Sequence, residues 1–338
     1  KCKSFVRQFM EFLIVTMGTV QMANVRDTSN NLRTVVPSSI NLYTAGGAGA
    51  VNRGVIVGIG TAAPAISDYK LQTPIAHGTA ANQLQYATQD YEAPASPDAT
   101  TSYMGLRRGF TNGSGASITI REVGIYGCDS TGGDFMFARD LITGGLAVPN
   151  GATATITYRI VVIVPGFTRQ FINLISRQLR CATISAVDIT NTTRSEADAI
   201  NTLRVVGPGG KSAITQISTA TYIGEDIGIV IGTGITAVDT GDWKLATKIV
   251  HGKAATQLLH YGTYVENFLT VADNTGTFKI ERTWENVSGA SIVVNEIGLY
   301  SGAGSSFLFQ IARRLVDPAV TVANGEVLRA TFTVSITT

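Results

Sequence analysis

Residues 114–126 read SGASITIREVGIY, and residues 288–300 read SGASIVVNEIGLY. In both stretches a Ser-Gly turn leads into a run rich in Ile and Val, which is typical of a β-strand entered through a tight turn. Two stretches this similar within one chain indicate an internal repeat. The rest of the chain can be aligned outward from this pair.

A constant offset of 174 (288 − 114) aligns positions on both sides of the pair. Near the start of each copy, the segment 4–9 matches 166–171 at an offset of 162, so the second copy carries a net insertion of 12 (174 − 162) before Gly228. We predict a duplicated chain with domains at 1–165 and 166–338, which meet at a Pro-Gly linker. The positions matched at 174 include Asp68 with Asp242, Tyr69 with Trp243, His77 with His251, Glu122 with Glu296, Arg139 with Arg313, and Asn150-Gly151 with Asn324-Gly325.

Each copy opens with a helical pattern, in which apolar residues recur at the spacing of one helical face. We expect this stripe to pack on the sheet beside it; the alternative is an exposed stripe that docks onto a neighbouring subunit. The stripes consist of Phe5, Phe9, Phe12, Leu13 and Met17 in the first copy, and of Phe167, Phe171, Leu174, Ile175 and Leu179 in the second.

The last segment of each copy alternates between apolar and polar residues over 154–162 and 328–336. Such alternation predicts a strand with one buried face. Asn150-Gly151 and Asn324-Gly325 precede these strands and suit a tight turn, since both residue types tolerate positive φ. The chain is thus predicted to be mainly β: two tandem homologous antiparallel β-sandwich domains, each preceded by an amphipathic helix.

Composition excludes several classes of protein. Hydrophobic residues make up 44% of the 338 residues and charged residues 15%, and the net charge of +2 gives no reason to expect a specific nucleic acid or an anionic membrane as partner. No apolar run approaches the length of a membrane span. The cysteines, Cys2, Cys128 and Cys181, form no CxxC pair, so we interpret them as buried or incidental thiols.

His77 and His251 occupy the same position of the repeat, each before a glycine. A metal site or a general base would need partners at suitable spacing, and none accompanies both histidines. We therefore expect each imidazole to hold a loop through a hydrogen bond. His260 has no counterpart in the first copy, where Tyr86 stands nearby, and it completes no site.

Glu122 and Glu296 lie within apolar strands, where a carboxylate is unexpected. One reading is a general acid or base. The other, which we favour, is a structural salt bridge with Arg139 and Arg313, because both partners recur in both copies.

The remaining candidates for chemistry are weaker. Gly58-Ile59-Gly60 and Gly232-Thr233-Gly234 resemble fragments of phosphate loops but lack the rest of the motif, so glycines at strand bends explain them better. The aspartates near Asp239 do not follow a calcium-loop pattern. With no catalytic signature in the sequence, we predict no enzyme activity, no cofactor and no metal site.

Several of these motifs together resemble repeats of tailed-bacteriophage virion proteins. The resemblance covers about 54–164 and 228–338, and its motifs are patterns of turns and strands. It implies a particle component, such as a neck, tail, fibre or capsid-associated protein, and it transfers no active-site residue. The motifs are Gly-Ile/Thr-Gly, Asp-Tyr/Trp-Lys-Leu followed by His-Gly and Gln-Leu, Ser-Gly-Ala-Ser-Ile followed by Glu-Val/Ile-Gly-Ile/Leu-Tyr, and Asn-Gly before a Thr-rich alternating strand.

We accordingly expect a structural or assembly component of the virion that forms a homo-oligomer through sheet edges and helix faces and contacts other virion proteins. A fused repeat would give a ring twice as many similar units as chains, which could bridge rings of different symmetry. The alternative is a cell-surface adhesin or carbohydrate-binding protein built from tandem sandwiches, with Tyr69 and Trp243 as a surface-aromatic contact.

Overall fold

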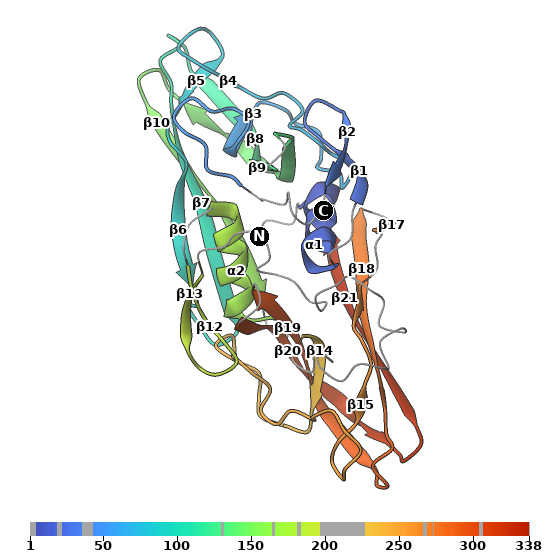
Figure 1. Cartoon of the computed structure of the whole chain (residues 1–338). Coiled ribbons are helices and arrows are strands. Elements are labelled where there is room, and N and C mark those ends of the chain that lie inside the picture. Colours follow the sequence, from blue (N-terminus) through green and yellow to red (C-terminus); the bar gives the residue numbers. More distant parts are fainter. Residues whose placement is uncertain are drawn as a thin grey trace.

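The computed structural model describes residues 5–18, 22–35, 43–129, 132–163, 166–180, 184–196, 227–265, 269–272, 274–303 and 307–337. Among these described residues the fold is mainly β, with 53% in strands, several sheets and two helices (Figure 1). Below, the first half means residues 1–165 and the second half residues 166–338. Neither helix in the described part of the chain has the length and apolar character needed to cross a membrane.

The first half contains an antiparallel sheet in which β8 (Ile118–Cys128) lies between β3 (Gly54–Gly58) and β9 (Asp134–Val148). A second sheet forms around β7 (Thr101–Thr111), which pairs with β10 (Thr153–Ile163) over eleven residue pairs without a bulge. The shorter strands β6 (Asp90–Ala95) and β5 (Gln83–Tyr86) also pair with β7, and β4 (Ala76–His77) runs parallel to β5.

The second half repeats these pairings at the offset of the sequence repeat. Strand β19 (Ile292–Ala303) lies between β14 (Gly228–Gly232) and β20 (Phe307–Val322), and β18 (Thr275–Glu285) pairs with β21 (Val327–Thr337) over eleven residue pairs. The register is the same as well, since Gly124 faces Arg139 and Gly298 faces Arg313. The shorter strands that pair with β18 are β15 (Leu259–His260), β16 (Tyr264–Val265) and β17 (Thr270–Ala272).

The closing strand β10 alternates as the sequence predicts: Tyr158, Ile160 and Val162 are buried, and the residues between them are exposed. The turn before it differs from the prediction. Only Gly151 adopts a positive φ, whereas the side-chain Oδ1 of Asn150 accepts a hydrogen bond from the backbone N–H of Gly115 at 2.8 Å. Asn150 therefore ties two neighbouring turns together instead of supplying a left-handed residue, and Asn324 does the same for Gly289.

Helices α1 (Arg7–Gly18) and α2 (Arg169–Arg180) begin two residues after the first residue of each apolar stripe, because Phe5 forms an isolated β-bridge with Ala138 and Phe167 lies in the short strand β11 (Gly166–Phe167). Both helices lie in the middle of the molecule (Figure 1). The stripes are buried apart from the half-buried Phe5 and Phe167, but so is the opposite face of each helix, with every side chain buried from Gln8 to Met17 and from Gln170 to Leu179. The helices are therefore not amphipathic surface helices, and the alternative of an exposed docking stripe is wrong.

Burial on all sides follows from contacts with both halves. Helix α1 packs against β9 and β1 (Met22–Arg26) of its own half, and against β16 and β18 of the second half. Helix α2 packs against β20 and β12 (Ile184–Val187) of its own half, and against β6 and β7 of the first half. The contacts are reciprocal, because β6 and β7 occupy the positions in the first half that β16 and β18 occupy in the second. Most buried apolar side chains of both halves form one continuous cluster, and Val230, Leu245 and Tyr300 form a separate small one.

The start of each helix is anchored in the same way, which explains the matching sequences at 4–9 and 166–171. The backbone N–H of Val6 donates to the carbonyl of Phe137 at 2.9 Å, and that of Thr168 donates to the carbonyl of Ile311 at 2.8 Å. Phe167, in the short strand β11 (Gly166–Phe167), stacks on Phe171 as Phe5 stacks on Phe9, with centroid distances of 4.0 and 4.1 Å.

Each helix is followed by a hairpin, formed by β1 with β2 (Leu32–Val35) and by β12 with β13 (Thr193–Glu196). Asp27 and Asp188 stand at the same place in these two turns, at an offset of 161 (188 − 27), and the sequence alignment did not find this match. Because the hairpins keep nearly the spacing of the helices, the extra residues of the second half lie between Arg194 and Gly228. Most of that connection, 197–226, lies outside the described residues.

Candidate functional site

The strongest polar arrangement of the first half surrounds the carboxylate of Glu122 on β8. The carboxylate is fully buried and accepts hydrogen bonds from the backbone N–H groups of Gly60, Gln72 and Thr73 at 3.1, 3.0 and 2.7 Å. It also accepts a bond from Nε of Arg139 on β9 at 2.9 Å. A buried carboxylate is stable in this setting because each oxygen has donors in place of water.

Arg139 extends this arrangement to a loop. Its side chain is 3% exposed, and its guanidinium forms an ion pair with Asp68 at 2.7 Å and donates to the carbonyl of Ala62 at 2.9 Å. The Glu122–Arg139–Asp68 network thus fastens residues 60–73 to the β3–β8–β9 sheet. We call it the first ion network.

The second ion network repeats these contacts in the second half. Glu296 accepts hydrogen bonds from the backbone N–H groups of Gly234 and Thr247 at 3.1 and 2.8 Å. Arg313 forms ion pairs with Glu296 at 2.9 Å and with Asp242 at 2.7 Å. The pairing of Glu and Arg suggested by the sequence is therefore present in both halves, and each network includes an aspartate, Asp68 or Asp242, that sequence reasoning left out.

The Gly-x-Gly motifs belong to these networks. A Cβ atom added to Gly58 or Gly60 would lie 2.5 Å from the carboxylate Oε1 of Glu122, which is far inside van der Waals contact. Gly232 and Gly234 are equally close to Glu296, at 2.6 and 2.4 Å. These glycines thus make room for an anion of the protein itself, and the lack of a side chain matters here more than backbone freedom.

Two further residues of this region were missed by sequence reasoning. The hydroxyl oxygens of Tyr126 and Tyr300 accept hydrogen bonds from the backbone N–H groups of Leu71 and Leu245, both at 2.7 Å. Burial raises the pKa of Tyr126 above its usual range, so the phenol is neutral at physiological pH. The spacing from Glu122 to Tyr126, repeated from Glu296 to Tyr300, is the signal that could have identified the pair.

A buried arginine on each long central strand was also missed. Arg108 on β7 donates to the backbone carbonyls of Ala87, Arg53 and Gly47 at 2.7, 3.0 and 2.9 Å. Arg282 on β18 donates in the same manner to Tyr261 and Ile227 at 2.7 and 3.0 Å. Burial lowers the pKa of Arg108 to about 10, which leaves it charged at neutral pH. Each arginine joins a strand of one sheet to the chain that enters β3 or β14.

Each histidine of the repeated pair holds a loop. Nδ1 of His77 accepts a hydrogen bond from the backbone N–H of Tyr86 at 3.1 Å, and Nδ1 of His251 accepts one from that of His260 at 2.9 Å. Tyr86 thus stands in the first half where His260 stands in the second. The rings of His251 and His260 meet edge to face at a centroid distance of 5.7 Å.

The aromatic pair Tyr69 and Trp243 is half-buried, and cations cover both rings. The amino group of Lys244 lies 4.6 Å from the ring centroid of Trp243. Lys70 and Arg26 lie 5.7 and 5.9 Å from the ring centroid of Tyr69. Sugar rings stack on open aromatic faces, so these contacts do not favour a sugar platform.

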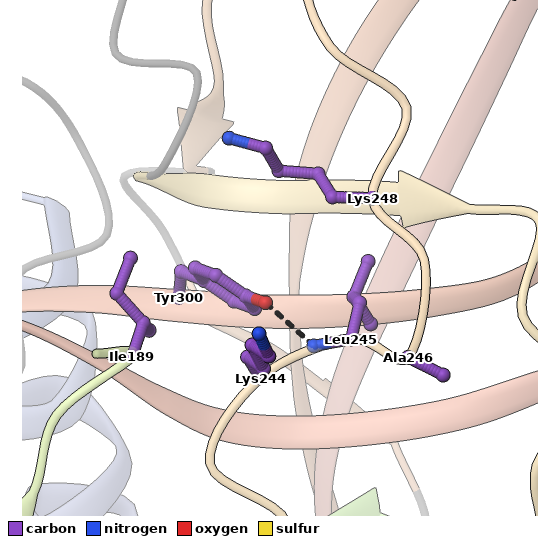
Figure 2. Close-up of a pocket in the computed structure, with 6 residues that line it drawn as sticks. All are labelled: Ile189, Lys244, Leu245, Ala246, Lys248 and Tyr300. Carbon is purple, nitrogen blue, oxygen red and sulfur yellow. Dashed lines mark hydrogen bonds between the residues drawn. The ribbon is translucent and has the colours of Figure 1, made fainter. Parts of the chain in front are cut away.

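An open pocket of about 250 Å³ lies beside the second ion network (Figure 2). Lys244 and Lys248 contribute its positive charge, and Figure 2 shows the hydroxyl of Tyr300 bonded to Leu245 among the lining residues. Lys248 corresponds to Pro74, so the first half lacks the same pair of lysines. The remaining residues that line the pocket are Ile189, Leu245 and Ala246.

Within the described ranges, no group of three or more His, Cys, Asp or Glu side chains is placed to hold a metal ion. Cys128 is buried on β8, and Cys2 and Cys181 lie outside the described residues. No protein-family model matches the chain, and no curated protein or solved structure matches it at a significant level.

Proposed function

We propose that the chain is a non-enzymatic structural component of a tailed-bacteriophage particle, built from two tandem β-sandwich copies, that associates with other copies of itself through sheet edges. The observation that carries this proposal is a pair of long strands, β10 and β21, each at the edge of its sheet. The similarity of the turn and strand motifs to virion repeats supports the particle as the location.

Among the described strands, β10 pairs only with β7, and β21 pairs only with β18. Natural proteins usually protect such edges with prolines, bulges or charges. Edge strand β6 follows this rule, with Pro94 and an irregular register, whereas neither β10 nor β21 contains a proline or a bulge. Each carries one charged residue, Arg159 or Arg329, which is paired with Glu92 or Glu281 of its own half. Val161 and Ile163 on β10 are 50% and 63% exposed. A strand of this kind is a template for pairing with another chain.

The polar chemistry supports a structural role. The carboxylates of Glu122 and Glu296 are occupied by backbone N–H groups and by arginine, so neither is placed to exchange a proton with a substrate. The helix faces, however, do not support association, because both helices are buried between the halves. We therefore assign self-association to the strand edges alone.

The recurrence of contacts supports two copies of one sandwich unit, with the boundary near residue 165. Both ion networks, both histidine contacts and both arginine contacts recur at a spacing of 174. Cross-sheet bonds, such as that from Arg108 to the carbonyl of Val55 at 3.2 Å, join the β7 sheet to the β3 sheet, as a sandwich requires.

The experiment places lysines on the exposed face of both edge strands, with Thr155→Lys and Val161→Lys on β10, and Thr331→Lys and Ser335→Lys on β21. Mass is followed against concentration by light scattering. We expect the parent protein to form an oligomer that these variants dissociate towards the 35.6 kDa chain, because lysines at an edge oppose strand pairing.

The matched control places lysines in the exposed turns at Ser117 and Ser291, away from the edges. This variant should keep the mass of the parent. A parent protein that stays monomeric at high concentration would contradict self-association. An oligomer that resists the edge lysines would place its interface elsewhere.

A further inference from the structure

The packing at the C-terminal end of β18 differs from the packing at the C-terminal end of β7, the matching strand of the first half. In the first half, the hydroxyl of Tyr86 donates to the carbonyl of Ile75 at 2.6 Å and lies near that of Val57 at 3.3 Å. The Tyr86 ring meets Phe110 edge to face, with centroids 4.9 Å apart. All polar atoms of this side-chain pair therefore have partners.

In the second half, His260 replaces Tyr86 and Trp284 replaces Phe110. These side chains are 4% and 0% exposed, with ring centroids 6.2 Å apart. Within the part of the chain that the structure describes, neither the two ring nitrogens of His260 nor the indole Nε1 of Trp284 have a hydrogen-bond partner. The imidazole is too short to reach the carbonyls that the tyrosine hydroxyl reaches. Unpaired polar atoms in a buried place reduce stability.

The charged groups that act on the His260 imidazole are basic, and the carboxylate of Glu285 on the paired strand is bonded to the hydroxyl of Tyr261. Arg282 lies on the neighbouring strand β18, with its guanidinium 5.7 Å from the ring centroid of Trp284, and it is already bonded to three backbone carbonyls. His251 touches the His260 ring, and Lys248 is the third basic group that acts on it. No carboxylate contributes to the electrostatics of His260 among the described residues. A proton on His260 would therefore be a buried positive charge among positive charges.

We propose that His260 makes the second half an acid-sensitive element: when His260 takes up a proton, the packing around Trp284 opens, while the first half, with Tyr86 and Phe110, stays closed. This inference does not depend on the proposed function.

The direction of the pH dependence follows from the environment. Burial, and then the charges of Arg282, His251 and Lys248, lower the pKa of His260 to about 3, against an unfolded value of about 6.5. A group whose folded pKa is depressed in this way binds protons more readily in the open state. The equilibrium constant that favours the closed state over the open state therefore has its full value above pH 6.5. Below pH 6.5 it falls by up to about tenfold per pH unit.

The experiment is hydrogen exchange with mass spectrometry on the full chain between pH 8 and pH 4, corrected for the intrinsic pH dependence of exchange. Peptides that cover 258–265 and 278–285 should exchange at least about tenfold faster at pH 4.5 than at pH 7.5. Peptides that cover 84–91 and 104–111 are the control within the same molecule and should not change.

The double variant His260→Tyr with Trp284→Phe installs the pair of the first half and should abolish the acid response. His260→Gln, which cannot titrate in this range, should abolish it as well, and it provides the test if the double variant does not fold. An acid response that persists in His260→Gln, or that appears equally in both halves of the parent protein, would overturn the proposal.

Discussion

At the residue scale, the Glu–Arg pairs of the ion networks could be predicted from the sequence, but the backbone groups that they bind could not. The pairing of Glu122 with Arg139 can be proposed because both residues recur with Glu296 and Arg313. The contribution of the backbone cannot be read in this way, because the N–H groups of Gly60 and Thr73 come from a loop that lies far from Glu122 in the sequence. Tyr126 and Arg108 look like ordinary strand residues, and only the folded chain shows which carbonyls and amides they reach.

The first prediction concerns the charge of Glu122. Replacing it with Gln removes one of the two carboxylates that pair with the buried Arg139 and leaves Asp68 as the other, and removing one partner of a buried pair typically costs about 3–5 kcal/mol. We expect Glu122→Gln to lower the free energy of unfolding by about that amount, and Glu296→Gln to act similarly in the second half. Urea denaturation followed by circular dichroism measures both.

The matched control is Glu92→Gln, because Glu92 pairs with Arg159 at the surface, where the two side chains are 29% and 53% exposed. Exposed pairs contribute roughly 0–1 kcal/mol, so this variant should change little. If Glu122→Gln were as mild as Glu92→Gln, the network would not be a source of stability.

At the element scale, strands were easier to predict than helix environments. Alternation located β10 and β21, since one face of each strand is buried and period-2 patterns report this directly. The helices were located by their stripes, yet their full burial depends on a second sheet from the other half, which no local pattern contains. The hairpins were missed because their match falls at a spacing of 161, which neither of the two assigned spacings covers.

The hairpin turns give the second prediction. The carboxylate of Asp188 accepts hydrogen bonds from the backbone N–H groups of Thr190 and Thr192 at 2.9 and 3.0 Å, and from Nε of Arg194 at 2.6 Å. Burial favours the protonated form, but a hydrogen bond from the hydroxyl of Thr190 at 2.6 Å, together with these bonds, outweighs it and lowers the pKa of Asp188 to about 2. Asp188→Asn should therefore loosen β12 and β13 by about 1–3 kcal/mol, measured by hydrogen exchange.

The sign of the pH effect is fixed by the lowered pKa. The contribution of Asp188 is present above its unfolded pKa of about 3.9 and is lost as the pH falls towards 2. Asp239→Asn serves as the control, since Asp239 is an exposed turn residue that caps Gly241. Equal effects of the two substitutions on β12 and β13 would show that the Asp188 turn does not hold the hairpin.

At the scale of the whole molecule, the contact between the halves is reciprocal. Helix α1 meets β16 and β18, and helix α2 meets β6 and β7, which is the pattern of a two-fold, self-complementary interface. Such an interface closes on itself, so it does not extend into a ring. A ring of these chains with twice as many similar units as chains would need a second surface, and this is why the edges of β10 and β21 carry the association in our proposal.

The reciprocal packing also predicts that a substitution that weakens the packing of one helix destabilises both halves. Leu174 on α2 is 1% exposed, and α2 packs on β20 of its own half and on β7 of the first half. Leu174→Ala should lower the free energy of unfolding by about 2–5 kcal/mol and raise the exchange of amides in both β20 and β7.

Leu245→Ala is the matched control, because Leu245 belongs to a separate small cluster with Val230 and Tyr300. Its effect should stay within the second half. If Leu174→Ala left β7 unchanged, the halves would be independent domains that only touch, and the chain would behave as two units rather than one.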